Sequence, residues 1–158
     1  MAEVIGRPDE TLTLSLSPVS PLTFPDHEAE AILEIARLGI TFGPLPCPTA
    51  GTTAPITIAG AVAQQNAEIL AALVLAQLVR PGLPIIYCGR LAMMEPRTGL
   101  SVWGGVELGI ASAITVQVGH HYGLPVNVYG FSTNAHNLDA QERELDQLMV
   151  AAQNELVN

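Results

Sequence analysis

The sequence predicts an α/β fold of four successive strand–helix units, with parallel strands that form half of a (β/α)8 TIM barrel. Short apolar runs alternate with helical patterns along the chain. The predicted strands begin roughly thirty to forty residues apart, which is the spacing of such a barrel. One of them, Pro84–Cys88, is continuously apolar, as are parallel strands buried on both faces. A complete barrel has about 250 residues, so this chain corresponds to about half of one.

An open, flavodoxin-like sheet is the alternative fold. It would require a fifth strand and a phosphate loop after the first strand. The segment P-V-S-P at 18–21 does not form a phosphate loop, and no G-x-G-x-x-G motif follows any predicted strand. These observations favour the half barrel.

The first unit begins after a polar, frayed segment at residues 1–10, so the predicted domain is 11–158. Alternating residues predict a strand over Thr11–Ser17 with one face buried. Asp26 is expected to cap a helix over 27–38, because its side chain can accept a free backbone N–H. Gly39 then ends this helix.

The second unit contains a strand over Ile40–Leu45, a proline-rich loop and a long helix over Pro55–Val79. Thr52 or Thr53 is expected to cap this helix, with Pro55 in its first turn, where a missing N–H is harmless. The third unit is the strand Pro84–Cys88, a long loop, and a helix over 104–122. The fourth is a strand over Val126–Gly130, a loop, and a helix from Asp139 to the end.

Composition restricts the partners. The formal net charge is −9 and all six basic residues are arginines, which argues against nucleic acid and against anionic membranes. Only 13% of residues are charged, so part of the surface is expected to lie against another subunit, as in a homo-oligomer. No signal peptide is visible, and the long helix carries polar residues that favour a buried position over a membrane span. These features predict a cytoplasmic protein.

Several long motifs resemble the trimethylamine methyltransferase family, and they occur in the order expected for it. They are C-P-T-A-G-T-T-A-P-I-T at 47–57, A-E-I-L-A-A-L-V-L-A-Q-L-V-R-P-G at 67–82, M-E-P-R-T-G at 94–99, Y-G-L-P-V at 122–126 and S-T-N-A-H at 132–136. The resemblance covers the chain from about Ser17 to Gln141. It implies a portion of a longer (β/α)8 barrel.

The resemblance also implies an activity in methylamine metabolism. Family members move a methyl group from a methylated amine to the cobalt of a separate corrinoid protein, so no directly bound cofactor is expected. Some members carry pyrrolysine, which the motifs place near residues 134–137. Only ordinary residues stand there, so the chain resembles the non-pyrrolysine branch, whose substrates include betaine-like quaternary amines.

Holding a quaternary ammonium requires aromatic faces, because ring quadrupoles attract cations that cannot donate hydrogen bonds. Candidate substrate-binding residues therefore are the aromatic residues at or beyond strand ends: Tyr87, Trp103, Tyr129 and Phe131. In a chain with 4% aromatic residues, this placement carries weight. The alternative is that the tyrosines form the barrel wall and that Trp103 packs under a loop.

Polar candidates occupy the loops after the strands. Arg90 and Arg97 could bind a substrate carboxylate in a bidentate manner, or form ion pairs with Glu95 or Glu107. Glu95 could serve the substrate cation. Glu95 and His136 are the catalytic candidates; the neutral imidazole of His136 could orient substrate or approach the corrinoid ring, or the residue could simply be an exposed loop histidine. Thr49 and Thr52 could bind an anionic group through their amides and hydroxyls, or simply cap the helix.

The two cysteines are predicted to be free, buried and inert. Cys47 and Cys88 do not form a C-x-x-C pair, lack the spacing of a zinc site, and have no visible base nearby. A non-catalytic half barrel is the rival to the enzyme. Four units would leave two sheet edges open, and exposed edges favour pairing with another chain. Such a chain would assemble with itself or with other chain portions.

Overall fold

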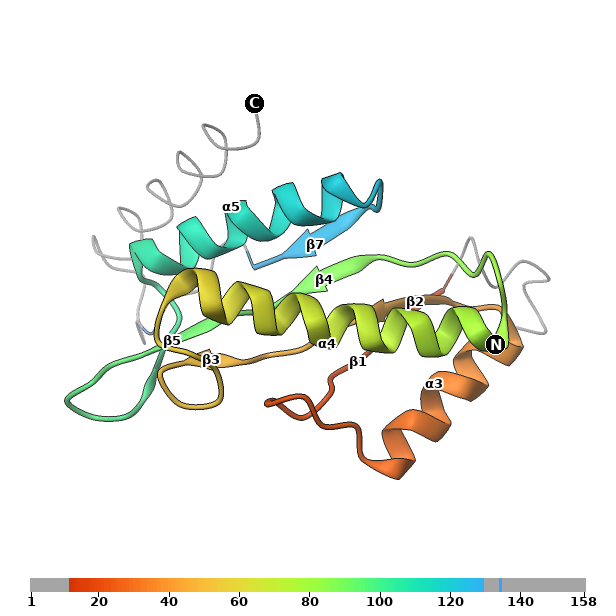
Figure 1. Cartoon of the computed structure of the whole chain (residues 1–158), viewed down its shortest axis with the longest axis horizontal. Helices are drawn as coiled ribbons and strands as arrows, with labels where there is room; N and C mark the ends of the chain where they lie inside the picture. Colours follow the sequence, from red (N-terminus) through yellow and green to blue (C-terminus); the bar gives the residue numbers. More distant parts are fainter. Residues whose placement is uncertain (1–11, 130–133, 135–158) are drawn as a thin grey trace.

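The computed structural model describes residues 12–129 and 134, and its strands and helices alternate along the chain (Figure 1). The helices are α3 (Asp26–Leu38), α4 (Ile58–Val79) and α5 (Val106–His121). The strands are β1 (Thr13–Leu16), β2 (Thr41–Pro44), β3 (Thr49–Ala50), β4 (Tyr87–Gly89), β5 (Ala92–Met94), β6 (Ser101–Val102) and β7 (Val126–Val128).

The main strands are parallel and neighbour one another in chain order. β1 pairs with β2, and β4 pairs with β7. A single parallel bridge between Phe42 and Ile85 joins the two pairs. There the N–H of Phe42 donates to the carbonyl of Pro84 (3.1 Å), and the carbonyl of Phe42 accepts from the N–H of Ile86 (2.9 Å). The predicted α/β class with parallel strands is therefore confirmed, without a closed barrel among the described residues.

The helices α3 and α4 cover the side of the sheet to which Phe42 points. Phe42 is fully buried, and burial of such a side chain contributes roughly 1.5–3 kcal/mol. It lies in one apolar cluster with residues of both helices and of the segment before β4: Ile32, Ile35, Ala36, Ala72, Ala76 and Ile85.

Helix α5 covers the same side of the sheet. A Cβ placed on Gly119 of α5 would lie 3.2 Å from Cδ1 of Tyr87. A Cβ on Gly89 would overlap the side chains of Gln65 on α4 and Thr115 on α5. Tyr87 and Gly89 point the same way as Ile85, because alternate residues of a strand share a face. We call this side the helix face.

The intervening residues point to the opposite side, which no helix of the described part of the chain covers. We call it the helix-free face. A Cβ on Gly43 would lie 2.9 Å from Sγ of Cys88 and 3.0 Å from Oγ of Ser15, so these three positions share this face. Asn127, the register partner of Cys88, is exposed on it.

A small second sheet lies where the main strands end. β3 pairs with β5 in parallel, and β5 pairs with β6 in the antiparallel sense. We expected residues 89–103 to be a loop, and that expectation was wrong. The strands of this hairpin are only two or three residues long, which is too short for an alternating pattern to be visible.

Two predicted helix starts also require correction. α4 begins at Ile58, and its N-cap is Thr57, whose Oγ1 accepts from the N–H of Gly60 (3.3 Å). Thr52 and Thr53 instead lie in a turn closed onto the carbonyl of Thr49, so the helix starts only after that turn. α3 begins at Asp26 itself and has no side-chain cap. The predicted end of α3 at Gly39 is confirmed, in the left-handed conformation (φ 71°).

Helix α4 is long and apolar enough to cross a membrane by length and composition, as core helices of soluble proteins also can be. Here it packs against α3, α5 and the sheet. It buries Gln65 and Glu68, which hydrogen bond within the fold. One third of its most apolar 18 residues is buried, and Val74 and Leu78 remain exposed. The predicted frayed segment 1–10 and the predicted last helix lie outside the described residues.

Candidate substrate site

Arg90 follows β4, and its side chain reaches across to β7. One guanidinium N–H donates to Oδ1 of Asn127 (2.8 Å). The guanidinium carbon lies 4.1 Å from the ring centroid of Tyr129, which is a cation–π arrangement. Asn127 and Tyr129 are alternate residues, so both contacts come from the helix-free face. The Arg90 guanidinium is thus held by two contacts, a hydrogen bond to Asn127 and a cation–π contact with the Tyr129 ring.

Trp103 extends this arrangement from the loop after β6. Its ring centroid lies 5.2 Å from that of Tyr129 at an interplanar angle of 82°, the edge-to-face geometry that aromatic rings favour. Its backbone N–H donates to Oδ1 of Asn134 (2.6 Å), whose amide donates to the carbonyl of Ser101 (3.1 Å). We call Arg90, Trp103, Asn127 and Tyr129 the Arg90 cluster.

The positive charge of Arg90 acts on the pKa of both cysteine thiols. Both are free, as predicted. Burial raises the pKa of the Cys88 thiol to about 11, and the Arg90 charge acts in the opposite direction. Surrounding protein atoms also raise the pKa of Cys47, again opposed by Arg90. Cys88 is buried but Cys47 is exposed, so the prediction of two buried thiols was wrong for Cys47.

The cluster is suited to binding an anion. A guanidinium has several donors in a rigid plane, and it can bind a carboxylate through two parallel hydrogen bonds. Stacking on Tyr129 and the bond to Asn127 restrict the side chain before any ligand arrives. The same stacking places Arg90 on one face of Tyr129, where we had expected a substrate cation.

Tyr87 lies on the opposite face of the sheet. It is fully buried, and its hydroxyl donates to Oδ1 of Asn66 on α4 (2.8 Å), whose amide donates to the hydroxyl of Tyr122 (3.1 Å). Burial raises the pKa of Tyr87, and Tyr122 adds to the shift. The structure therefore does not bring Tyr87 together with Tyr129 and Trp103.

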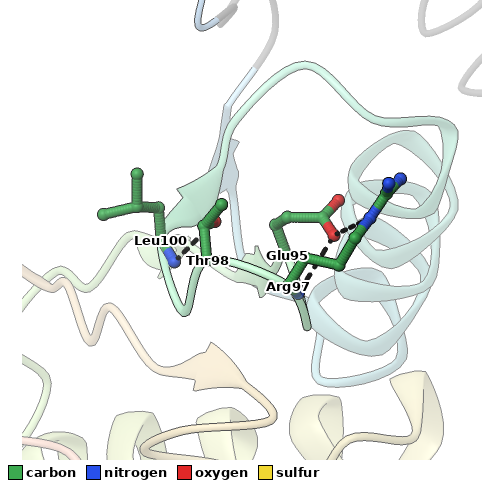
Figure 2. Close-up of polar contacts among 4 residues, drawn as sticks. All are labelled: Glu95, Arg97, Thr98 and Leu100. Carbon is green, nitrogen blue, oxygen red and sulfur yellow. Dashed lines mark hydrogen bonds and ion pairs between the residues drawn. The ribbon is translucent and has the colours of Figure 1, made fainter.

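Glu95 and Arg97 lie in the turn between β5 and β6 (Figure 2). Oε1 of Glu95 accepts from the backbone N–H of Arg97 (3.2 Å) and lies 3.4 Å from its Nε. The Arg97 side chain is 91% exposed, so this ion pair is the solvated alternative that we considered for it. Glu95 also borders a cavity of about 350 Å³, whose lining is Ala50, Ile56, Met93, Met94, Glu95, Pro96, Val102 and Glu107.

Thr49 and Thr52 lie in the turn that precedes α4. The carbonyl of Thr49 accepts the backbone N–H groups of Thr52, Thr53 and Ala54. The N–H of Thr49 donates to Oγ1 of Thr53 (2.9 Å), and the Thr52 hydroxyl donates back to the carbonyl of Thr49 (3.3 Å). These amides are paired within the turn, which differs from the anion cradle expected from the sequence.

Comparison with known proteins identifies the family to which the chain belongs. Residues 6–154 match the model of the trimethylamine methyltransferase (MTTB) family. The chain belongs to this family.

Individual relatives of the family give the same result. The chain is 35% identical over 127 residues to trimethylamine methyltransferase MttB of Desulfitobacterium hafniense, an alignment that covers 80% of this chain and 26% of the relative. It is 33% identical over 136 residues to the protein of that name from Methanosarcina thermophila, covering 86% and 28%. A glycine betaine methyltransferase of D. hafniense is 30% identical over 126 residues, covering 80% and 26%. The chain thus spans about a quarter of their length.

For this trimethylamine methyltransferase family member, the predicted residues Phe131 and His136 lie outside the described residues. Sequence reasoning missed Asn127 and Asn134, which contact Arg90 and Trp103 directly. Asn127 had a signal, because it is a polar residue in an otherwise apolar strand. Among the described residues, no group of three or more His, Cys, Asp or Glu side chains could hold a metal ion.

Proposed function

We propose that the chain is part of an enzyme that moves a methyl group from a tertiary or quaternary amine, with a betaine-like zwitterion favoured, to the cobalt of a separate corrinoid protein. The single observation that supports a zwitterion is the restrained Arg90 guanidinium, stacked on Tyr129 and bonded to Asn127. Trimethylamine has no carboxylate that would use it. A relative in the family is named a glycine betaine methyltransferase.

We further propose that the helix-free face belongs to the interior of a (β/α)8 barrel. Two features support this: parallel strands that follow chain order, and helices confined to one side. Both are features of a barrel wall. The carboxyl ends of the strands, where Arg90 lies, are the end of a barrel at which active sites form. The remaining strands would come from sequence beyond these 158 residues.

In this proposal the residues of the cluster bind and orient the substrate. Arg90 holds the carboxylate, and the edges and faces of Trp103 and Tyr129 exclude water around the methylated nitrogen. The corrinoid of the partner protein would supply the nucleophile for the methyl carbon. The C–N bond would break with its electron pair on nitrogen, so a quaternary nitrogen becomes a neutral amine. With a quaternary amine no proton has to move in this step, which suits a site built from Arg, Asn, Tyr and Trp, whereas a tertiary amine would first have to be protonated.

The corrinoid protein is the proposed partner, and a cytoplasmic homo-oligomer is the proposed form. The test is a methyl-transfer assay on the complete gene product that carries this chain. Glycine betaine, trimethylamine and tetramethylammonium would be offered with cob(I)alamin, whose absorbance changes on methylation. We expect glycine betaine to be the best of the three. Equal rates with tetramethylammonium would contradict the role of Arg90, and no methylation by any amine would contradict the activity.

A second candidate, a non-catalytic half barrel that assembles with itself or with other chain portions, is favoured by the exposed apolar residues of α4. Val74 and Leu78 are 52% and 77% exposed. Helix α4 also borders an apolar groove of about 590 Å³, lined by Leu70, Leu73, Gln77, Leu83, Pro84, Ile85, Tyr122, Leu124 and Pro125. Light scattering after size exclusion of the 158-residue chain tests it. A discrete dimer with a cooperative melt supports self-assembly, and a monomer contradicts it.

A further inference from the structure

A buried polar pair lies directly behind the residue that precedes Arg90. Gln65 of α4 and Thr115 of α5 are 0% and 2% exposed. Nε2 of Gln65 donates to Oγ1 of Thr115 (3.1 Å), and that hydroxyl donates to the carbonyl of Ala111 (2.7 Å). Both side chains pack against Gly89, where an added Cβ would overlap them. Two helices and the end of β4 therefore meet at one polar contact.

The buried pair of Gln65 and Thr115 stabilises the fold less than two apolar side chains of the same shape would. Oε1 of Gln65 is buried and has no hydrogen-bond partner in the described part of the chain. An unpaired buried acceptor loses its hydration without replacement, whereas two apolar side chains of the same shape would avoid that loss. Buried polar groups that remain unpaired require a reason other than packing.

Gln77 on the same helix is a glutamine whose amide nitrogen and oxygen are both hydrogen bonded. Its amide donates to the carbonyl of Leu83 (2.8 Å), and its oxygen accepts from the N–H of Gly82 (2.8 Å). Both ends of this side chain are used, and they fasten the turn after α4. Gln65 instead donates to Thr115 of α5 (3.1 Å) and packs against Gly89 at the end of β4, the residue before Arg90.

We propose that Gln65 and Thr115 are positioning residues that fix the carboxyl end of β4 and so place the Arg90 guanidinium for substrate. The inference rests on the proposed function. Gly89 has no side chain to separate the pair from the strand, and Arg90 is the next residue. A shift of the strand end would therefore move the guanidinium away from Tyr129 and Asn127. A displaced guanidinium would bind the substrate carboxylate less well, because two parallel hydrogen bonds require a defined geometry.

The test is the double variant Gln65→Leu/Thr115→Val in the complete gene product, with Gln77→Leu as the matched control. A role in packing alone predicts unchanged kinetics and an equal or higher Tm. Positioning predicts that KM for glycine betaine rises roughly tenfold or more, with kcat nearly unchanged, because a binding contact to the carboxylate is weakened. The single variant Thr115→Ser keeps the hydroxyl that accepts from Gln65 but loses the Cγ2 next to Gly89, so it should raise KM less than the double variant does. An unchanged KM in the double variant would overturn the inference.

Crystal structures of the wild type and the double variant separate this inference from the proposed function. We expect the distance from the Arg90 guanidinium to the Tyr129 ring, 4.1 Å here, to increase in the double variant and to stay in Gln77→Leu. If the wild type turns over no methylated amine, the proposed function fails and this distance alone decides the inference. An unchanged distance overturns it. If the double variant does not fold, Thr115→Val is measured in the same way.

Discussion

Tyr87 and Tyr129 come from adjacent parallel strands and have opposite surroundings. Tyr87 points to the helix face, where it is fully buried and its hydroxyl bonds to Asn66. Tyr129 follows β7 on the helix-free face, half-buried between Arg90 and Trp103. One ring is enclosed by helices, and the other supports a charged side chain.

The difference shows that position along a strand does not identify a site residue. The sequence places both tyrosines at or beyond strand ends, and both are candidates for the same aromatic site, but in the structure Tyr87 begins β4 and Tyr129 follows β7. Because side chains alternate between faces, a change of one position reverses the role. The helix face should therefore respond to mutation through stability, and the Arg90 cluster through substrate binding.

The largest expected effect lies among the helices, at Glu68. This carboxylate is 1% exposed and accepts from the Ser20 hydroxyl (2.8 Å), the Leu22 N–H (2.9 Å) and the Gln64 amide (3.0 Å). Glu68→Ala leaves these donors without an acceptor, so we expect unfolding to be easier by about 3 kcal/mol. Urea denaturation measures this, and Glu68→Gln, which keeps one acceptor, should lose less. A urea midpoint of Glu68→Ala equal to that of the wild type would contradict a stabilising role for this carboxylate.

The next effect concerns the Arg90 cluster. Arg90→Gln removes a charged donor, so kcat/KM for glycine betaine should fall by roughly 30-fold, the equivalent of about 2 kcal/mol. The Tm should hardly change, because the side chain is not in the core. Arg97→Gln is the matched control, since its ion pair is solvated and worth less than about 0.5 kcal/mol. If both variants lose activity equally, the assignment of Arg90 is wrong.

Part of this comparison could be predicted from the sequence. The order of strands and helices followed from apolar runs and from glycines such as Gly39, whose left-handed conformation ends α3. Arg90, Trp103 and Tyr129 were identified by residue type and loop position. The faces were not, because a strand of three residues such as β4 has no alternation strong enough to assign. Thr57 was missed as the cap because the turn at 49–54, closed by hydrogen bonds onto the carbonyl of Thr49, delays the start of the helix and leaves no clear signal in the sequence.

The two thiols should show a smaller contrast that depends on pH. The Cys88 pKa is raised by burial from 9.0 to about 11, so the thiol stays protonated in the fold when the unfolded chain ionises. Its stabilising contribution is complete below about pH 9 and is lost as the pH rises toward about 11. We expect the wild type to lose more stability across that range than Cys88→Ala, measured by denaturation at both ends. Equal losses would contradict burial of this thiol.

The same thiols also differ in access. Cys47 is exposed and Cys88 is buried, so a thiol reagent at pH 8 should modify Cys47 first and reach Cys88 only after unfolding. Mass spectrometry of the digested protein distinguishes the two sites. Modification of Cys88 at the rate of Cys47 would mean that the sheet face around Gly43 is more open than this structure shows.

The most direct test of the two-face account compares Tyr87→Leu with Tyr129→Leu, measuring the free energy of unfolding and KM for glycine betaine in the same preparations. Tyr87→Leu should lose about 2–3 kcal/mol of stability and keep its KM. Tyr129→Leu should keep its stability and raise KM roughly fivefold or more, because Arg90 loses its support. A raised KM in Tyr87→Leu at wild-type stability, or a destabilised Tyr129→Leu with normal KM, would contradict the account.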